Sequence, residues 1–271
     1  MFDLSRFLLL ANDRCNLRCK LCSESIPNHK PEPDMTVEQA RKILKSFFET
    51  VDHIGKMHIS GGGEPFLHAR LPELIEECMV YRKQFDEFII FTKSTITPNQ
   101  ELLDTLGKYS DVITVRMSCY GLYPEKERNL QQLFEANHVK YHMIKYSGED
   151  QDYGGWVDYG DYVKYNRSED ELKRMFAECA TKRDLNGNWR SRDGELHICT
   201  RSQRGMQLGL VPRVEKDYVD LLDESLSVEQ KQEKIKAILT ADYITACDYC
   251  SGDYGTRDKR KRYPAAEQIE K

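Results

Sequence analysis

The sequence predicts an α/β fold in which a partial, TIM-like (β/α)6 barrel precedes a small cysteine-bearing C-terminal domain. Short apolar segments alternate with amphipathic segments of helical period over about 180 of the 271 residues. Glycine, serine and cysteine residues cluster directly after the apolar segments. The remaining sequence has too little apolar content for a large core of its own. Alternating strands and helices form parallel βαβ units, and about six units fit here, fewer than the eight of a closed barrel.

Each unit is predicted from its own pattern along the chain. The expected strands cover residues 6–11, 56–60, 87–92, 111–118 and 139–145, with a sixth at 156–163. The helices that follow them cover residues 36–50, 71–83, 98–106, 124–136 and 169–179. The carboxyl ends of parallel barrel strands share one face, where ligand sites are built. We therefore expect the segments that follow the strands to converge there.

The region after the predicted barrel has a different character. Residues 192–195 are predicted to form a turn into a strand at 196–200, with a partner strand near 206–211 and a helix at 228–240. We expect two domains, residues 1–178 and 179–271. The second ends in a basic tail, in which residues 257–262 carry five basic side chains against Asp258. A solvated tail is the simplest interpretation, and docking of a phosphorylated substrate is an alternative.

Composition and charge exclude several classes of protein. The formal net charge of −5 disfavours a generic nucleic-acid binder. The longest apolar run, residues 7–11, is far shorter than the roughly 20 residues that a membrane-spanning helix needs, and too short for a secretory signal. We expect a cytoplasmic protein. Nine cysteines in such a chain point to metal or redox chemistry, because reducing compartments disfavour structural disulfides.

Three cysteines form a closely spaced group after the first strand. Cys15, Cys19 and Cys22 have the spacing C-x3-C-x2-C. Three thiolates can hold three irons of a [4Fe–4S] cluster and leave the fourth iron open. The open iron could take a small chelating ligand, such as the amine and carboxylate of an amino acid. A partial zinc site is the alternative.

Four further cysteines can close a second site. Cys179, Cys199, Cys247 and Cys250 would supply four thiolates, enough for a second cluster or for a structural Zn(Cys)4 site. His197 is expected to be a neighbour of this site and not a ligand. The two cysteines that belong to neither group, Cys78 and Cys119, are interpreted as packing residues. The competing hypothesis for Cys119 is that its thiol donates a hydrogen atom to a substrate radical. Strand alternation places Cys119 on the face opposite Ser118.

These motifs resemble those of the radical S-adenosylmethionine (radical SAM) superfamily. The resemblance rests on the Cys15, Cys19 and Cys22 loop and on the GGGEP segment after the second strand, and it covers roughly residues 6–180. Residues 179–250 resemble the auxiliary-cluster module of the twitch, or shortened SPASM, type. There the pattern is C-x14-G-x4-C followed by C-x2-C.

The resemblance implies roles for particular residues. The first three cysteines would hold a redox-active [4Fe–4S] cluster that binds SAM, and the other four would hold one auxiliary [4Fe–4S] cluster. The residues expected to contact SAM are Gly61, Gly62, Gly63 and Glu64, then Thr92, Ser94 and Ser118. Relatives often have Asn-Gly where this chain has Lys93-Ser94, which weakens that one assignment. One-electron reduction would cleave SAM and give a 5′-deoxyadenosyl radical.

The expected reaction is hydrogen abstraction from a polar small molecule, a sugar or cyclitol derivative, with a phosphorylated substrate as one option. Dehydrogenation is the first reaction type and epimerisation its close competitor. Asp158, Asp161 and Arg116 are the expected catalytic residues. An electron donor such as flavodoxin or ferredoxin is implied as a partner. Neither a nucleic acid nor a membrane is expected as a partner. A peptide-modifying maturase is the second hypothesis, although a first strand at residue 6 leaves no room for a leader-recognition domain. A non-catalytic iron–sulfur or zinc interaction module is the third.

Overall fold

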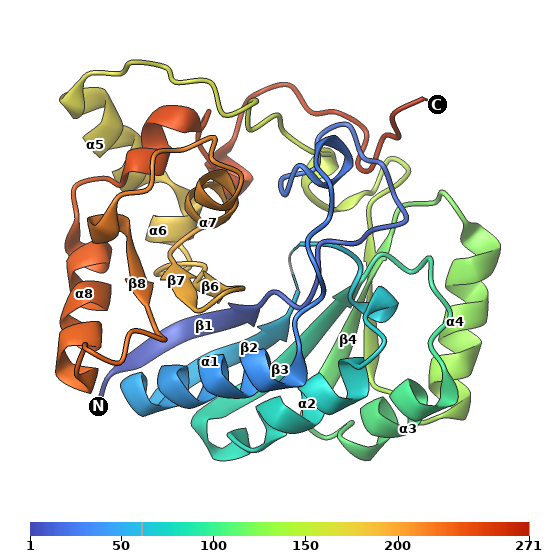
Figure 1. Cartoon of the computed structure of the whole chain (residues 1–271). Coiled ribbons are helices and arrows are strands. Elements are labelled where there is room, and N and C mark those ends of the chain that lie inside the picture. The colour runs from blue at the N-terminus through green and yellow to red at the C-terminus, as the bar shows by residue number, and fades with distance from the viewer. Residues whose placement is uncertain (61, 271) are drawn as a thin grey trace.

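The computed structural model describes residues 1–60 and 62–270, and an open, mostly parallel sheet forms its centre (Figure 1). Eight described strands lie in the order β5-β4-β3-β2-β1-β6-β7-β8. The barrel strands are β1 (Asp3–Leu9), β2 (His53–Ile59), β3 (Phe85–Thr92), β4 (Ile113–Cys119) and β5 (Tyr141–Lys145), all parallel to their neighbours. The sheet does not close, which confirms the predicted α/β class and partial barrel.

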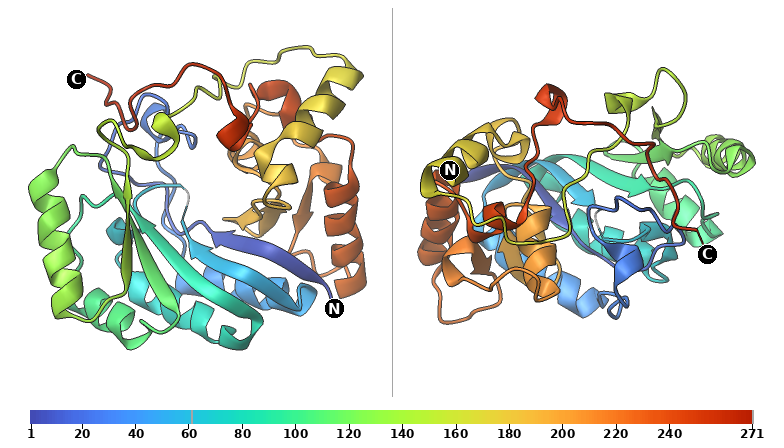
Figure 2. Two further views of the ribbon diagram at one scale, coloured as in Figure 1. Left: turned by 180° about the vertical axis from the view of Figure 1, so that it is seen from behind. Right: turned by 90° about the horizontal axis from the view of Figure 1, so that it is seen from above.

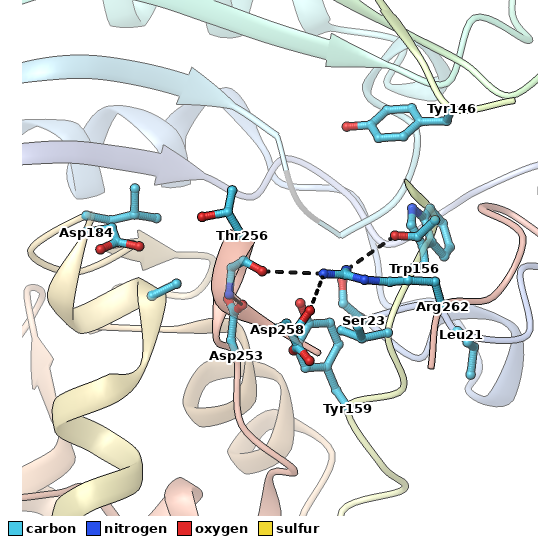
Figure 3. A pocket seen from close by; sticks show the side chains of 15 residues that line it. Leu21, Ser23, Tyr146, Trp156, Tyr159, Asp184, Asp253, Thr256, Asp258 and Arg262 are labelled. Atoms are coloured by element: carbon cyan, nitrogen blue, oxygen red, sulfur yellow. Dashed lines mark hydrogen bonds between the residues drawn. The ribbon is translucent and has the colours of Figure 1, made fainter. Parts of the chain in front are cut away.

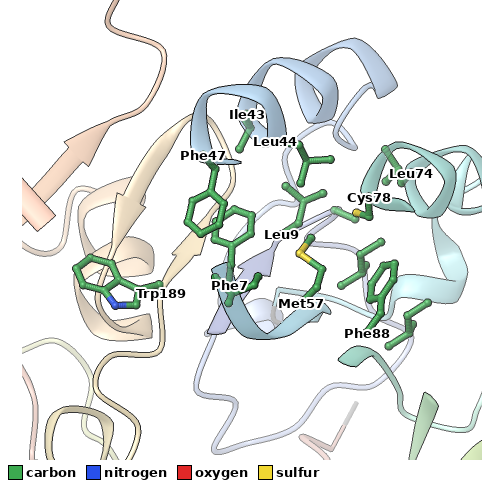
Figure 4. Close-up of a cluster of buried hydrophobic side chains, with 14 of the residues drawn as sticks. Phe7, Leu9, Ile43, Leu44, Phe47, Met57, Leu74, Cys78, Phe88 and Trp189 are labelled. Carbon is green, nitrogen blue, oxygen red and sulfur yellow. The ribbon is translucent and has the colours of Figure 1, made fainter. Parts of the chain in front are cut away.

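Four helices cover the outer face of these strands (Figure 1): α1 (Val37–Thr50), α2 (Leu71–Met79), α3 (Gln100–Lys108) and α4 (Pro124–Ala136). Alternation along the strands sends one set of apolar side chains toward the helices. Phe7 of β1 stacks on Phe47 of α1 with ring centroids 3.9 Å apart, and Met57 of β2 is fully buried nearby (Figure 4). Cys78 and Cys119 belong to the same hydrophobic core, in agreement with their interpretation as packing residues.

The sixth predicted strand, at residues 156–163, is wrong. This segment is irregular, and its one described bridge joins Trp156 to Tyr263 of the C-terminal tail. Gly155, Gly160 and Tyr162 have φ values of 109°, 78° and 60°, which extended strands do not use. Among the described residues the barrel therefore has five strands, β1 to β5, and the chain leaves β5 to line a cavity instead of continuing the sheet.

The C-terminal region continues the same sheet from the other side of β1. β6 (Arg190–Ser191) is parallel to β1, while β7 (Glu195–His197) and β8 (Tyr218–Asp220) follow antiparallel. The predicted turn before β7 is present, but the predicted strand near 206–211 is wrong because β8 is the partner of β7. Cys199 instead begins a helix, since its Sγ accepts a hydrogen bond from the Ser202 amide.

Four α-helices complete this region: α5 (Glu169–Glu178), α6 (Ala180–Arg183), α7 (Thr200–Gln207) and α8 (Val228–Thr240). Short 3-10 segments lie at η1 (Ile26–Asn28), η2 (Pro65–Leu67), η3 (Arg82–Gln84), η4 (Asp152–Gly154), η5 (Glu215–Asp217), η6 (Thr245–Tyr249) and η7 (Gly255–Arg257). The predicted helices at 124–136 and 228–240 agree with α4 and α8. One hydrophobic core extends from β1 to α8, so the cysteine-bearing region packs directly on the barrel.

Within residues 1–60 and 62–270, no helix has the length and apolar character needed to cross a bilayer.

Candidate active site

The three cysteines of the first motif face one cavity at the carboxyl end of β1. Cys15, Cys19 and Cys22 line a space of about 170 Å³ together with Gly62 and Lys93. No group of three Cys, His, Asp or Glu side chains in the described part of the chain converges on a single metal ion. Three thiols around one cavity, with no fourth thiol among its described lining residues, fit a cubane cluster in which each thiolate takes its own iron.

Backbone contacts with the segment after β2 hold the cysteine loop in place. The Gly63 amide donates to the Asn12 carbonyl at 2.9 Å, and the Glu64 amide donates to the Arg14 carbonyl at 2.7 Å. A Cβ atom on Gly63 would overlap the backbone of Arg14. Gly62 has φ +63°, and a Cβ atom there would lie only 2.3 Å from the Asn12 carbonyl oxygen, so both positions require glycine. Gly61, predicted to share this role, lies outside the described residues.

The other predicted SAM contacts lie at or just after the carboxyl ends of β2, β3 and β4 and are buried. The Glu64 carboxylate accepts hydrogen bonds from the backbone amides of Phe66 at 3.0 Å and Lys93 at 2.5 Å, so it ties the ends of β2 and β3 together. Thr92 accepts a hydrogen bond from the Ser94 amide. Ser94 is buried as well. Burial raises the pKa of the Cys119 thiol to about 11, and a hydrogen bond with the Ser94 side chain acts in the opposite direction.

Ser118 is also buried and lies near the Tyr120 hydroxyl, which lines the three-cysteine cavity. Burial raises the pKa of Tyr120 far above its usual value, and Ser118 partly offsets the rise. Tyr120 is therefore a neutral hydrogen-bonding group. Contact of Thr92, Ser94 and Ser118 with SAM stays a prediction.

The thiols of the three-cysteine loop have raised pKa values. Burial raises the pKa of Cys19 to about 11, while a hydrogen bond from Gln268 and the charge of Lys93 act in the opposite direction. Burial likewise raises the pKa of Cys15 and Cys22. Without metal these thiols are protonated at neutral pH, so loading of a cluster must release their protons.

The C-terminal tail covers the cysteine loop, which the sequence did not predict. The Gln268 side chain donates to Cys19 Sγ at 3.5 Å and accepts from the Arg18 amide at 2.7 Å. The Lys20 and Ile269 amides add backbone bonds between loop and tail at 2.8 and 2.7 Å. Figure 2 shows the tail crossing the carboxyl end of the barrel to reach this loop. About 250 residues separate the partners, so no local pattern could reveal the contact.

The four remaining motif cysteines line a second cavity of about 240 Å³. Cys179 follows α5, Cys199 precedes α7, Cys247 lies in η6 and Cys250 follows it. Burial, together with the nearby thiols, raises the pKa of Cys199 to about 12, while a hydrogen bond from the Ser202 amide acts in the opposite direction. The sequence-predicted set of four is thus brought together. His197 is absent from the described lining, and its Nδ1 lies 3.0 Å from the Ser202 hydroxyl.

A third cavity, of about 490 Å³ (Figure 3), shares lining residues with both cysteine sites. Ser23 lines all three cavities. Trp156 is shared with the three-cysteine cavity, and Tyr159 is shared with the four-cysteine cavity. Tyr146 and Arg262 complete this central cavity with several further residues. The sequence analysis selected this segment because of its aspartates, whereas the residues that line the cavity are Trp156 and Tyr159.

The three predicted catalytic residues lie elsewhere. Asp158 is exposed, and its Oδ1 accepts a hydrogen bond from the Gly160 amide at 2.7 Å, which closes a turn. Asp161 is exposed. Arg116 is on the inner face of β4, 5.7 Å above the Phe91 ring. None of them is among the described lining residues of the three cavities, so the structure does not bring them to the cysteines.

Buried ion pairs join the cysteine loop to the C-terminal region. Asp13 accepts hydrogen bonds from Arg192 and Arg204, both at 2.9 Å, and all three side chains are at most 3% exposed. Glu24 pairs with Arg190 at 2.6 Å, also out of solvent. Charged residues are rarely fully buried unless paired. The residues next to the three cysteines are therefore fixed by arginines of the C-terminal region.

Comparison with known proteins identifies one sequence family and several solved structures with a similar fold. The sequence model described as Radical SAM superfamily matches residues 10–145. Two proteins named "Probable GTP 3',8-cyclase", from Methanococcus maripaludis strains C5 and C7, are 36% identical over 74 residues, which is 27% of this chain. The match spans about a quarter of the length of these curated relatives (24%).

Solved structures share the fold at low sequence identity. The crystal structure of BtrN in complex with AdoMet and 2-DOIA aligns with TM-score 0.58 and 15% identity over 99% of both chains. The native anSMEcpe structure with bound AdoMet aligns with TM-score 0.52 and 16% identity, over 87% of this chain and 84% of that one. An anSMEcpe structure with AdoMet and the Cp18Cys peptide gives TM-score 0.51 and 17% identity over 87% and 83%.

Proposed function

Because the chain belongs to the radical SAM superfamily, whose sequence model matches residues 10–145, we propose that it cleaves SAM reductively and abstracts a hydrogen atom from a polar small molecule. A sugar or cyclitol derivative is the proposed substrate, and dehydrogenation of a secondary alcohol is the proposed reaction. The observation that carries this proposal is the central cavity, which Ser23 connects to both cysteine sites.

Cys15, Cys19 and Cys22 would hold a [4Fe–4S] cluster with one iron free for the amine and carboxylate of SAM. When bound and reduced, that cluster and SAM supply the 5′-deoxyadenosyl radical. The chain's own part is to position and enclose them. Gly62 and Gly63 hold the loop by close backbone contact, and Lys93 Nζ donates to the Gly63 carbonyl at 2.5 Å.

Cys179, Cys199, Cys247 and Cys250 would hold one auxiliary [4Fe–4S] cluster, as in twitch-type relatives. Residues 1–178 would then carry the SAM chemistry and residues 179–271 the second redox centre. Oxidation of a secondary alcohol to a ketone removes one hydrogen atom, one proton and one electron. The hydrogen atom would pass to the deoxyadenosyl radical, the proton to solvent or a cavity carboxylate, and the electron to the second site. A flavodoxin or ferredoxin would supply the electron that starts the reaction.

The lining of the central cavity suits an amphipathic polyol. Trp156 and Tyr159 provide apolar ring faces, and Ser23 and Thr256 provide hydroxyls. Epimerisation remains the competing reaction, because it differs only in the return of a hydrogen atom. A peptide substrate is the second candidate, and the likeness of this fold to that of peptide-bound anSMEcpe favours it.

Anaerobic reconstitution followed by product analysis tests the proposal. Two [4Fe–4S] clusters correspond to about eight irons per chain. About four irons together with bound zinc would exclude the auxiliary cluster. The loaded protein with SAM and reductant should form 5′-deoxyadenosine, and absence of that product would exclude radical SAM chemistry.

Deuterated polyols and peptides then identify the substrate. Deuterium should pass from the abstracted position into 5′-deoxyadenosine with a polyol and not with a peptide. An oxidised product indicates a dehydrogenase, and an inverted product of unchanged redox state indicates an epimerase.

A further inference from the structure

We propose that Arg262 binds an anionic group of the substrate, so that the substrate carries a phosphate or a carboxylate. This inference rests on the proposed function, because it assigns the central cavity to the substrate. Arg262 lies in the C-terminal tail beyond η7, and its guanidinium extends across the cavity toward Asp258 and Thr256 (Figure 3).

The Arg262 guanidinium has no acidic partner in the described part of the chain. Its hydrogen bonds go to backbone carbonyls, from Nη2 to Asp258 at 3.2 Å, from Nη2 to Gly255 at 3.5 Å and from Nη1 to Gly155 at 3.5 Å. Ion pairs of the described residues include none at Arg262. Typical N–H···O bonds are near 2.9–3.0 Å, so these three long bonds leave donor capacity free.

The nearest carboxylate is already paired with another arginine. Arg260 donates to both oxygens of Asp258, at 3.0 Å from Nε to Oδ1 and 2.5 Å from Nη2 to Oδ2. It also donates to the Gly252 carbonyl at 2.6 Å. Arg260 is thus the structural arginine of this tail. Two residues further along, the charge of Arg262 helps to lower the pKa of Asp258, but the carboxylate oxygens of Asp258 are bonded to Arg260 and not to Arg262.

Attachment of the tail does not need Arg262. The segments that its side chain connects are already joined by two backbone bonds, Trp156 N to Tyr263 O at 2.8 Å and Tyr263 N to Trp156 O at 2.9 Å. The other charged residues of the cavity also have partners. Asp184 pairs with Arg183, and Asp253 Oδ1 accepts from the Gly255 amide at 3.1 Å.

The chemistry of guanidinium selects the ligand class. Its planar fork matches carboxylate and phosphate oxygens, and it stays charged at any physiological pH. An anionic end held by Arg262 would leave the rest of the substrate against Trp156, which also lines the three-cysteine cavity. Arg262 would then set which end of the substrate approaches the SAM site.

Binding of small probes tests the inference without radical chemistry. The reconstituted protein is titrated anaerobically, with neither SAM nor reductant, with inorganic phosphate, glucose 6-phosphate, glucuronate and glucose. Isothermal calorimetry should show that at least one anionic probe binds ten-fold or more tightly than glucose. Comparison of the affinities for glucose 6-phosphate and glucuronate distinguishes a phosphate site from a carboxylate site.

The variants assign that binding to one side chain. Arg262→Gln should weaken the anionic probe at least ten-fold, and Arg262→Lys should restore part of the affinity. Lys261→Gln is the matched control, since it removes one positive charge from the exposed neighbouring residue, and it should bind as the wild type does. Three results would each overturn the inference. The charged and neutral probes bind equally, none of the anions binds, or Arg262→Gln keeps the wild-type affinity. Because 5′-deoxyadenosine formation is measured separately, these outcomes leave the proposed function standing.

Discussion

The two cysteine sites are built in opposite ways. The three-cysteine site takes all its thiols from one short loop, residues 15–22, which has hardly any regular structure of its own. The four-cysteine site takes its thiols from segments spread over residues 179–250, each at the end of a helix or in a 3-10 turn. The first site is local in sequence and the second is assembled by the fold.

The residues that hold each site in place show the reverse contrast. The local loop is held by remote groups: Gly63 after β2, Gln268 in the tail, and Arg192 and Arg204, which pair with Asp13. The four-cysteine site is held by the helices that carry it. An open cluster site must leave one side free for a ligand, so its loop cannot be buried by its own neighbours. A closed site has no such requirement, and its thiols can be enclosed in the core.

Removal of one cysteine from each site gives the largest expected effect. Cys19→Ala should abolish 5′-deoxyadenosine formation and lower the iron content to about four per chain, because one site is lost. Cys199→Ala should lower the iron content equally but leave SAM cleavage measurable, while oxidised product disappears. Iron analysis and product chromatography on anaerobic samples make the comparison.

Cys78→Ala is the control for cysteine loss, since Cys78 is fully buried in α2 away from both sites. It should retain about eight irons. Loss of SAM cleavage in Cys199→Ala with retention in Cys19→Ala would reverse the assignment of the two sites.

The buried pairs at Asp13 test whether the two sites depend on each other. Asp13→Ala would leave the buried Arg204 without a carboxylate partner, and Arg192 with only the exposed Asp193 at 3.9 Å. Loss of one partner of a buried pair costs about 3–5 kcal/mol, so the urea midpoint of the reconstituted protein should fall. The three-cysteine site should also lose iron, because Asp13 lies two residues before Cys15.

Glu49→Ala is the surface control. The Glu49 carboxylate lies 3.8 Å from Lys45 at an exposed position, and such pairs contribute about 0–1 kcal/mol. If Asp13→Ala unfolds at the same urea concentration as Glu49→Ala, the buried pairs do not connect the two regions.

The sequence predicted features that depend on neighbouring residues, and it did not predict those that depend on contacts between distant residues. The three-cysteine loop and helices such as α4 and α8 depend on nearby residues, and spacing or periodicity predicted them. The aromatic residues at 156–163 resembled a strand, but Trp156 and Tyr159 line a cavity instead. Buried Arg192 and Arg204 could not be predicted, because charged side chains are normally exposed, and their partner lies about 180 or more residues away.

The smallest expected effect concerns the hydrogen bond from Gln268 to Cys19. Hydrogen bonds to cluster-ligating sulfurs stabilise the more negative, reduced state and so contribute to the reduction potential. Gln268→Leu should lower the midpoint potential of the SAM-site cluster and leave that of the second cluster unchanged. Deoxyadenosine formation should slow by less than ten-fold. Redox titration followed by electron paramagnetic resonance measures both potentials in one sample.

Glu267→Gln separates the amide from the tail as a whole. Glu267 is next to Gln268 in the tail and forms an exposed ion pair with Lys20 of the cysteine loop, so its loss alters the attachment of the tail but not the donor to Cys19. The potential of the SAM-site cluster should stay at the wild-type value in this variant. An equal shift in both variants would mean that the tail acts by covering the loop, because exclusion of solvent also changes a cluster potential. A shift confined to Gln268→Leu would extend the contrast between the sites, since a side chain far along the sequence would then adjust the open cluster.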